Sequence, residues 1–218
     1  MRVIVSIKAT PGGGNASQAT RYIAYRDRDE EREGKEPRKL FSAKEDALSF
    51  WQAERVLTAG RTPTKDEIAH LAVSFRPEDF QALGHSEAAR QQALKEVTRE
   101  AVAEIAGELK AESLTWVAGV HRNTDHPHLH LLLHKSYVDR ESGLEQRINR
   151  FPEGALPSRM QDKSGVEKIR SGSFSQAFAR ALDSAQERAK MQPETARTIS
   201  TSHVVASSSA EKEIATST

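Results

Sequence analysis

Two short apolar segments on either side of a run of turn formers constrain the fold of this chain most. Residues 114–120 and 128–134 are rich in strand-forming side chains, and residues 122–127 between them read Arg-Asn-Thr-Asp-His-Pro, a composition typical of a turn. This pattern predicts a β-hairpin. Because a hairpin joins antiparallel neighbours, it favours an antiparallel sheet over parallel β/α winding, in which strands are joined by crossovers.

The remaining periodic segments complete an α+β pattern. Alternating apolar residues predict strands over 2–8 and 70–75. A short helix is expected to begin near Ser17, which is a good N-cap residue. Further helices are predicted over three ranges, 46–57, 86–109 and 173–190. This order predicts an antiparallel sheet with helices on its faces.

Length and composition set the domain organisation and exclude several functions. We expect one domain over 1–190, followed by a disordered Ser/Thr-rich tail or linker over 191–218. The absence of cysteine excludes thiolate zinc sites, iron–sulfur clusters and a cysteine nucleophile. No early apolar stretch has the length of a signal peptide or membrane span, so a cytoplasmic protein is expected. The net charge of +1 points to no particular partner.

Three histidines are predicted to converge on the hairpin. His128 and His130 are two residues apart on one strand and therefore share a face, whereas the leucines between and after them point to the core. With the six-residue loop, His121 lies opposite His128, with Cβ atoms about 5 Å apart. Three neutral imidazoles can hold a divalent cation and leave positions open for substrate. The alternative interpretation is that these histidines are solvent-facing or structural.

Tyrosines of the first predicted helix are candidate nucleophiles. Tyr22 and Tyr25 stand beside Arg21 and Arg26. The ordinary pKa of tyrosine is about 10, so a phenol attacks only with help from a base, a metal or a neighbouring cation. The alternative is that both rings serve only in helix packing.

Taken together, these segments resemble a known family. Arg21-Tyr22-Ile23, together with His121 and the run His128-Leu129-His130-Leu131, resembles the HUH-type relaxases of conjugative and mobilisable plasmids, in particular the MobA/MobL branch that includes IncP-type relaxases. The segment 70–76 is similar to the central strand of that family. The likeness runs from residue 1 to about residue 138 and continues more weakly through 173–190. It implies an N-terminal catalytic domain with a palm-like sheet of about five antiparallel strands.

The resemblance also implies a reaction. A relaxase of this kind is a site- and strand-specific nickase of single-stranded DNA at an origin of transfer. By carry-over, Tyr22 attacks the scissile phosphodiester and forms a 5′-phosphotyrosyl intermediate, and Tyr25 is the next candidate. His121, His128 and His130 would hold Mn²⁺ or Mg²⁺. His70 is expected to act as a general base or to orient a ligand, and Asp125 to orient a histidine.

The expected partners follow from the same resemblance. They are single-stranded origin DNA, relaxosome accessory proteins and a type IV coupling protein, with the protein acting as a monomer away from membranes. Basic residues after the hairpin are equally well explained as a solvated loop or as a loop that DNA orders. These residues are Arg140, Arg147, Arg150, Arg159, Lys163, Lys168 and Arg170, with Phe151 as a stacking candidate. The charged stretch 26–39 is interpreted as a solvated loop or a lid.

Three other functions remain open at this point. The run 126–132 also resembles the histidine-triad nucleotide hydrolases, in which His128 would be the nucleophile without a metal; Pro127 and the length of the chain count against this. A rolling-circle replication initiator of the HUH group would share nearly the same chemistry. A DNA-binding or metal-storing module without catalysis is the third possibility.

Overall fold

The protein is built around a five-stranded antiparallel sheet. The computed structural model describes residues 3–8, 10, 15–25, 37–58, 67–121, 127–148 and 171–191. The sheet has the order β1-β3-β5-β4-β2, and every pairing in it is antiparallel. The strands are β1 (Val3–Lys8), β2 (Phe41–Ser42), β3 (Ile68–Phe75), β4 (Trp116–His121) and β5 (His128–His134). The predicted α+β class and antiparallel sheet are therefore confirmed.

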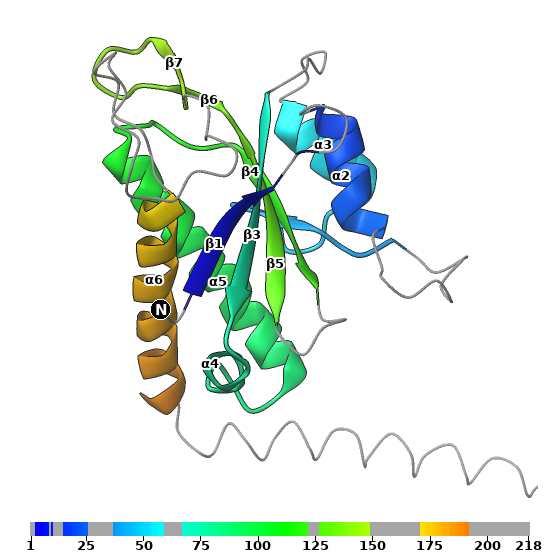
Figure 1. Ribbon diagram of the computed structural model, residues 1–218, viewed down its shortest axis with the longest axis vertical. Helices are drawn as coiled ribbons and strands as arrows, with labels where there is room; N and C mark the ends of the chain where they lie inside the picture. Colours follow the sequence, from blue (N-terminus) through cyan, green and yellow to red (C-terminus); the bar gives the residue numbers. More distant parts are fainter. Residues whose placement is uncertain are drawn as a thin grey trace, which may run out of the picture.

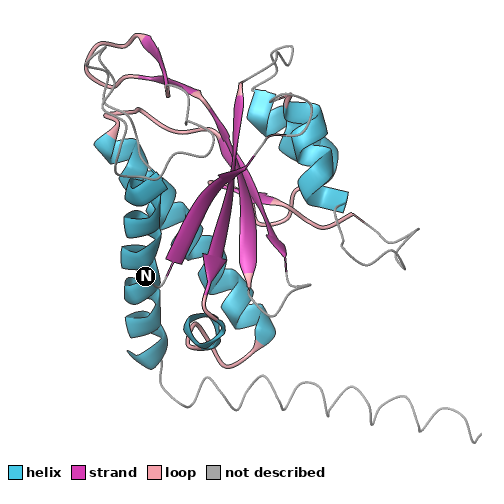
Figure 2. Cartoon of the chain, viewed as in Figure 1, coloured by secondary structure: helices cyan, strands magenta, loops and turns pink. Residues whose placement is uncertain are grey.

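Helices cover both faces of this sheet (Figures 1 and 2). One face carries α2 (Ala16–Tyr25) and α3 (Phe50–Thr58). The other face carries α5 (Glu87–Glu108) and α6 (Ser171–Met191). The short α4 (Pro77–Gln81) follows β3. In this arrangement the central strands β3, β5 and β4 lie between two helical layers.

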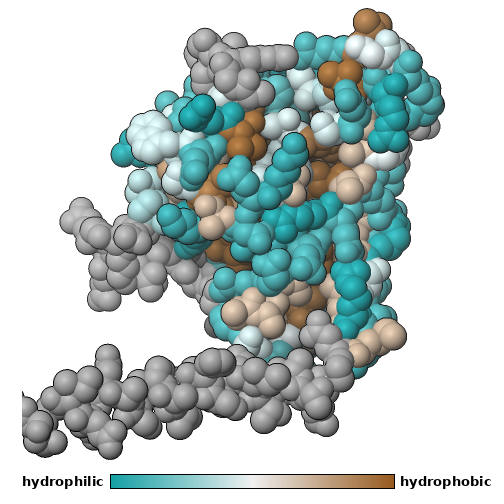
Figure 3. Space-filling view, turned by 180° about the vertical axis from the view of Figure 1, so that it is seen from behind, coloured by the Kyte–Doolittle hydropathy of each residue, from teal (hydrophilic) through white to brown (hydrophobic). Residues whose placement is uncertain are grey.

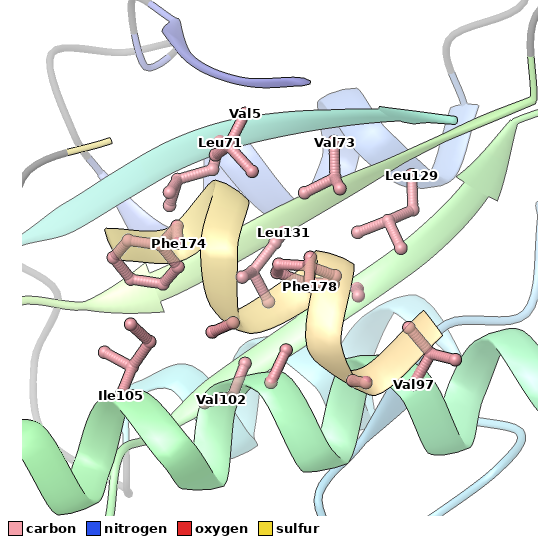
Figure 4. Close-up of a cluster of buried hydrophobic side chains, with 14 of the residues drawn as sticks. Val5, Leu71, Val73, Val97, Val102, Ile105, Leu129, Leu131, Phe174 and Phe178 are labelled. Carbon is pink, nitrogen blue, oxygen red and sulfur yellow. The ribbon is translucent and has the colours of Figure 1, made fainter. Parts of the chain in front are cut away.

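The alternation along β5 produces a separate core on each face. Leu129, Leu131 and Leu133 belong to the cluster shared with α5 and α6, and Figure 4 shows Leu129 and Leu131 among Phe178, Ile105 and other side chains of that layer. Leu132 points the other way and packs in the cluster formed with α2 and α3. Complete burial of each leucine contributes roughly 1.5–3 kcal/mol. These contacts fix which face His128 and His130 occupy.

The predicted helices have slightly different bounds in the structure. The side chain of Asn15, rather than Ser17, caps α2 by accepting a hydrogen bond from the backbone N–H of Gln18 at 3.2 Å. The helix expected over 46–57 begins only at Phe50, because Leu48 pairs with Leu40 in a β-bridge. Ser86 caps α5, where its hydroxyl accepts from the N–H of Ala89 at 3.1 Å, close to the predicted start.

The structure also contains elements that the sequence analysis missed. These are β2, α4 and a two-stranded ribbon of β6 (Ser136–Val138) and β7 (Glu145–Arg147). β7 lies in the polar stretch after the hairpin, for which no strand was predicted. Such elements are too short to show a periodic apolar pattern. The predicted tail beyond α6 lies outside the described residues.

The surface is mainly hydrophilic where it is seen from behind, with hydrophobic side chains in separate patches (Figure 3). Within the described ranges, every helix is too short or too polar to cross a lipid bilayer.

Candidate metal centre and active site

Strand pairing brings the three predicted histidines together at one end of the sheet. His121 ends β4 and pairs directly with His128, the first residue of β5, as the hairpin predicted. The ring centroid of His121 lies 5.5 Å from that of His128 and 4.4 Å from that of His130. His121 and His130 are buried, and His128 is half-buried. The cluster is therefore formed by local register alone.

The donor set of this cluster fits a divalent cation. One nitrogen of each ring lies within 4.8 Å of the other two. Imidazole nitrogens this close together could bind a single divalent ion after small side-chain rotations. His121, His128 and His130 are the residues that would hold the metal, and His134, further along β5, lies outside the group. Imidazole suits transition ions such as Mn²⁺ better than Mg²⁺.

A fourth histidine is hydrogen-bonded to this cluster from the neighbouring strand. Nε2 of His70 lies 2.7 Å from Nδ1 of His130. His70 is 2 % exposed and sits on β3, where its backbone partner in β5 is Leu132. A metal-binding histidine typically donates its other N–H to such an acceptor, which fixes the ring orientation and tautomer. His70 therefore holds the ring of His130 in place.

Arg38 joins the cluster to the end of α2. Its Nη1 lies 2.6 Å from Nε2 of His121, and the same nitrogen donates to the carbonyl oxygen of Ile23 at 3.5 Å. The backbone N–H of Arg38 donates to the carbonyl of Ala24 at 3.0 Å. These carbonyls belong to the last turn of α2, which has no intrahelical donors for them. Arg38 thus caps α2 and places a permanent positive charge beside His121.

Tyr22 lies against the histidines, whereas Tyr25 does not. The ring of Tyr22 meets that of His70 edge to face at 5.7 Å and that of His130 at 6.3 Å. The ring of Tyr25 instead lies 6.2 Å from Phe50, and Tyr25 is 52 % exposed. Of the two tyrosines of α2, Tyr22 is the one beside the candidate metal ligands.

A glycine on β4 makes room for Leu40 beside the site. Gly119 stands opposite His130 on β4. A Cβ added there would lie 2.8 Å from Cδ2 of Leu40 and 3.7 Å from the carbonyl oxygen of Ile23. Any larger residue would force Leu40 to shift. The absence of a side chain at Gly119 therefore makes room for Leu40, which packs in the cluster formed with α2 and α3.

Other predicted residues lie elsewhere. Asp125 falls outside the described residues, as do the basic residues from Arg150 to Arg170 and Phe151. Arg140 donates to the carbonyl of Ala111 at 3.0 Å, and Arg147 is exposed on β7. Since β6 follows the far end of β5, these two arginines are remote from His128. Arg38 was missed because it lies near the end of the charged stretch 26–39, which has no periodic pattern.

The fold and the site together define a class of protein: an antiparallel α+β domain with a three-histidine centre beside a tyrosine. A family model described as MobL relaxases matches residues 68–217, which is more than half of the chain. The chain belongs to the MobL relaxase family, and the resemblance drawn from the sequence is confirmed. No curated protein matches the chain significantly.

Membership of this family bears on the functions left open by the sequence. Relaxases nick DNA during mobilisation and bind it as a single strand, so the chain belongs to a family of DNA-nicking enzymes. This favours the relaxase interpretation over a histidine-triad nucleotide hydrolase. The matched region contains His70 and the three clustered histidines, whereas Tyr22 precedes it.

Proposed function

We propose that this protein is a site- and strand-specific nickase and strand transferase for single-stranded origin-of-transfer DNA, with Tyr22 as its nucleophile. The observation that carries the proposal is the position of Tyr22, whose ring contacts those of His70 and His130. A phenol in that position reaches a phosphate held at the histidine cluster. In this proposal residues 1–190 form the catalytic domain and act as a monomer.

The step is a transesterification. The Tyr22 oxygen bonds to the scissile phosphorus, and the bond from phosphorus to the 3′ oxygen breaks. The phenol proton leaves to water, and water returns a proton to the 3′ oxygen, so the products are a 5′-phosphotyrosyl link and a free 3′-hydroxyl. Covalent capture keeps the strand competent for rejoining without an external energy source.

The side chains around Tyr22 have distinct tasks. When Mn²⁺ or Mg²⁺ is bound by His121, His128 and His130, it supplies Lewis-acid polarisation of the phosphate. A ligating His130 donates from Nδ1 to Nε2 of His70, which occupies the lone pair of His70. We therefore assign His70 as a positioning residue rather than the general base. The guanidinium of Arg38 adds a positive charge that attracts the phosphate.

The expected setting of the reaction is the one that the family implies: single-stranded origin DNA, relaxosome accessory proteins and a type IV coupling protein, in the cytoplasm. Asp125 keeps its expected role of orienting a histidine as part of this proposal.

Labelled oligonucleotides that tile the DNA flanking the gene test the proposal. With Mn²⁺, a 3′-labelled strand should give a protein-linked band on a denaturing gel, and a 5′-labelled strand a shorter free fragment that a polymerase can extend. Tyr22→Phe should abolish both products. Tyr137→Phe, on β6 at the far end of β5, is the matched control and should leave them unchanged.

Peptide mapping distinguishes the two tyrosines of α2. Trypsin releases Tyr22–Arg26, which contains both Tyr22 and Tyr25, so fragmentation of the adduct peptide is needed to locate the nucleotide. A nucleotide on Tyr25, or an adduct that persists in Tyr22→Phe, would reassign the nucleophile. An adduct carrying the 5′ label would contradict the proposed polarity.

A further inference from the structure

Two helices carry a row of aromatic rings that catalysis does not use. The ring of Phe50 lies 6.2 Å from that of Tyr25 on α2 and 4.7 Å from that of Trp51 on α3. Phe50 is buried, whereas Tyr25 is 52 % and Trp51 70 % exposed. Among the exposed large hydrophobic residues in the part of the chain that the structure describes, Tyr25 and Trp51 are the aromatic ones. We call these three rings the aromatic row.

Positive charge accompanies the aromatic row. Arg21 precedes Tyr25 by four residues on α2, and Arg55 follows Trp51 by four residues on α3; both are exposed. Residues four apart lie on the same side of a helix. The remaining charged residue of the two helices, Glu54, is only half-exposed. Each exposed ring of the row therefore has a cation beside it.

The aromatic row adjoins the candidate active site. Tyr25 follows Tyr22 by less than one turn of α2, and Tyr22 contacts the rings of His70 and His130. α3 packs against α2 through the second hydrophobic cluster, which includes Phe50 and Ile23. A strand whose phosphate reaches Tyr22 would thus pass near the row.

We propose that the aromatic row is a stacking surface for bases of the single-stranded DNA next to the scissile phosphate, with Arg21 and Arg55 contacting its backbone. Non-specific single-strand sites combine aromatic platforms with cations in this way, because every base has a π-face. The buried ring of Phe50 holds the two exposed rings in place. The inference rests on the proposed function only in that the bound strand is the one that Tyr22 attacks.

Equilibrium binding tests the surface without chemistry. In a Tyr22→Phe background, which prevents covalent capture, the probe is a fluorescein-labelled single-stranded oligo(dT) at low salt. Trp51→Ala and Tyr25→Ala should each weaken binding about tenfold. Trp51→Phe and Tyr25→Phe, which retain a ring, should bind within about threefold of the parent. Met191→Ala removes an 83 % exposed side chain from α6, far from the row, and should have no effect.

Two further measurements separate stacking from charge or misfolding. An abasic chain of the same length and charge should bind the parent and Trp51→Ala equally. The second tryptophan, Trp116, is buried, so oligo(dT) should quench tryptophan emission and protect it from iodide in the parent but not in Trp51→Phe. Thermal unfolding of each variant shows whether the fold is retained.

Unchanged oligo(dT) affinity of both alanine variants would overturn the proposal and leave the row as a docking surface for a protein. If Trp51→Ala lost as much affinity for the abasic chain as for oligo(dT), the proposal would also be overturned. Failure of Tyr22 as the nucleophile appears separately, as a covalent adduct that persists in Tyr22→Phe while DNA binding is normal.

Discussion

Nε2 of His70 and Nδ1 of His130 are 2.7 Å apart, and both residues are buried. In a hydrogen bond between two neutral imidazoles, one ring donates its N–H and the other accepts with its unprotonated nitrogen. A His130 that ligates a cation through Nε2 carries its proton on Nδ1 and is the donor of this pair. The hydrogen bond is therefore compatible with the tautomer that metal binding requires, and ligation would fix its direction.

Removal of His70 should weaken metal binding without removing a ligand. His70→Ala is expected to lower Mn²⁺ affinity about 10- to 100-fold, the usual cost of losing a partner of a metal ligand. His70→Gln, whose amide oxygen can accept the bond, should recover part of this loss. Titration calorimetry measures both, and His134→Ala on β5 is the matched control. Equal affinities for all four proteins would show that His70 does not position His130.

Lowering the pH should break an ion pair between the loop that follows β2 and helix α5. The carboxylate of Asp46 lies 2.6 Å from Nη2 of Arg99, and the hydrogen bond from Arg99 lowers the pKa of Asp46. A lowered folded-state pKa gives stability that is present above the unfolded pKa and lost as pH falls through the folded value. Because Asp46 is half exposed, Asp46→Asn should lower the free energy of unfolding by less than about 1 kcal/mol at pH 7.

Urea unfolding at several pH values checks this prediction. The difference between the parent and Asp46→Asn should shrink as the pH falls below about 4. A double-mutant cycle with Arg99→Met isolates the pair from other effects. A difference that stays constant down to pH 2 would show that the ion pair is not its source.

Local periodicity accounts for the part of the site that was predicted from sequence. His121, His128 and His130 belong to one hairpin, so strand alternation and the length of the loop place all three. The long helix α5 was equally predictable, because Leu94, Val97, Ala101 and Ile105 form a buried stripe.

Non-local contacts account for what periodicity missed. The bond between His70 and His130 depends on the pairing of β3 with β5, and the residues are 60 positions apart. Arg38 reaches His121 from 83 positions away, and nothing in its own segment indicates that contact. The aromatic row is divided between α2 and α3 in the same way. Family likeness, rather than spacing, suggested that Tyr22 belongs to the site.

Metal binding should stabilise the fold. A cation that binds the folded state alone adds about 2.7 kcal/mol to the free energy of unfolding at one hundred times its Kd. Mn²⁺ should therefore raise Tm, and Mg²⁺ should do so less at the same concentration, because imidazole prefers transition ions. His128→Ala should lose most of the shift, whereas His134→Ala should retain it. A similar shift in His128→Ala would place the ion elsewhere.

Arg38 and a bound cation should compete for His121. A guanidinium only donates, so Nε2 of His121 accepts from Arg38 at 2.6 Å and its lone pair is used. Ligation through Nε2 would displace Arg38. Ligation through Nδ1 would put the proton on Nε2. That N–H would then donate to the carbonyl oxygen of Ile23, which is 3.1 Å away. In both cases the bond between Arg38 and His121 is lost when the metal binds.

Arg38→Met should therefore raise Mn²⁺ affinity, by about three- to tenfold, because it removes both a competing hydrogen bond and a nearby positive charge. The same substitution should lower the rate of DNA cleavage, since the displaced guanidinium is then adjacent to the metal-bound phosphate. Arg180→Met, which removes a positive charge from the exposed surface of α6, controls for net charge. Opposite changes in metal affinity and cleavage rate would be the signature of this competition, and a fall in Mn²⁺ affinity in Arg38→Met would refute it.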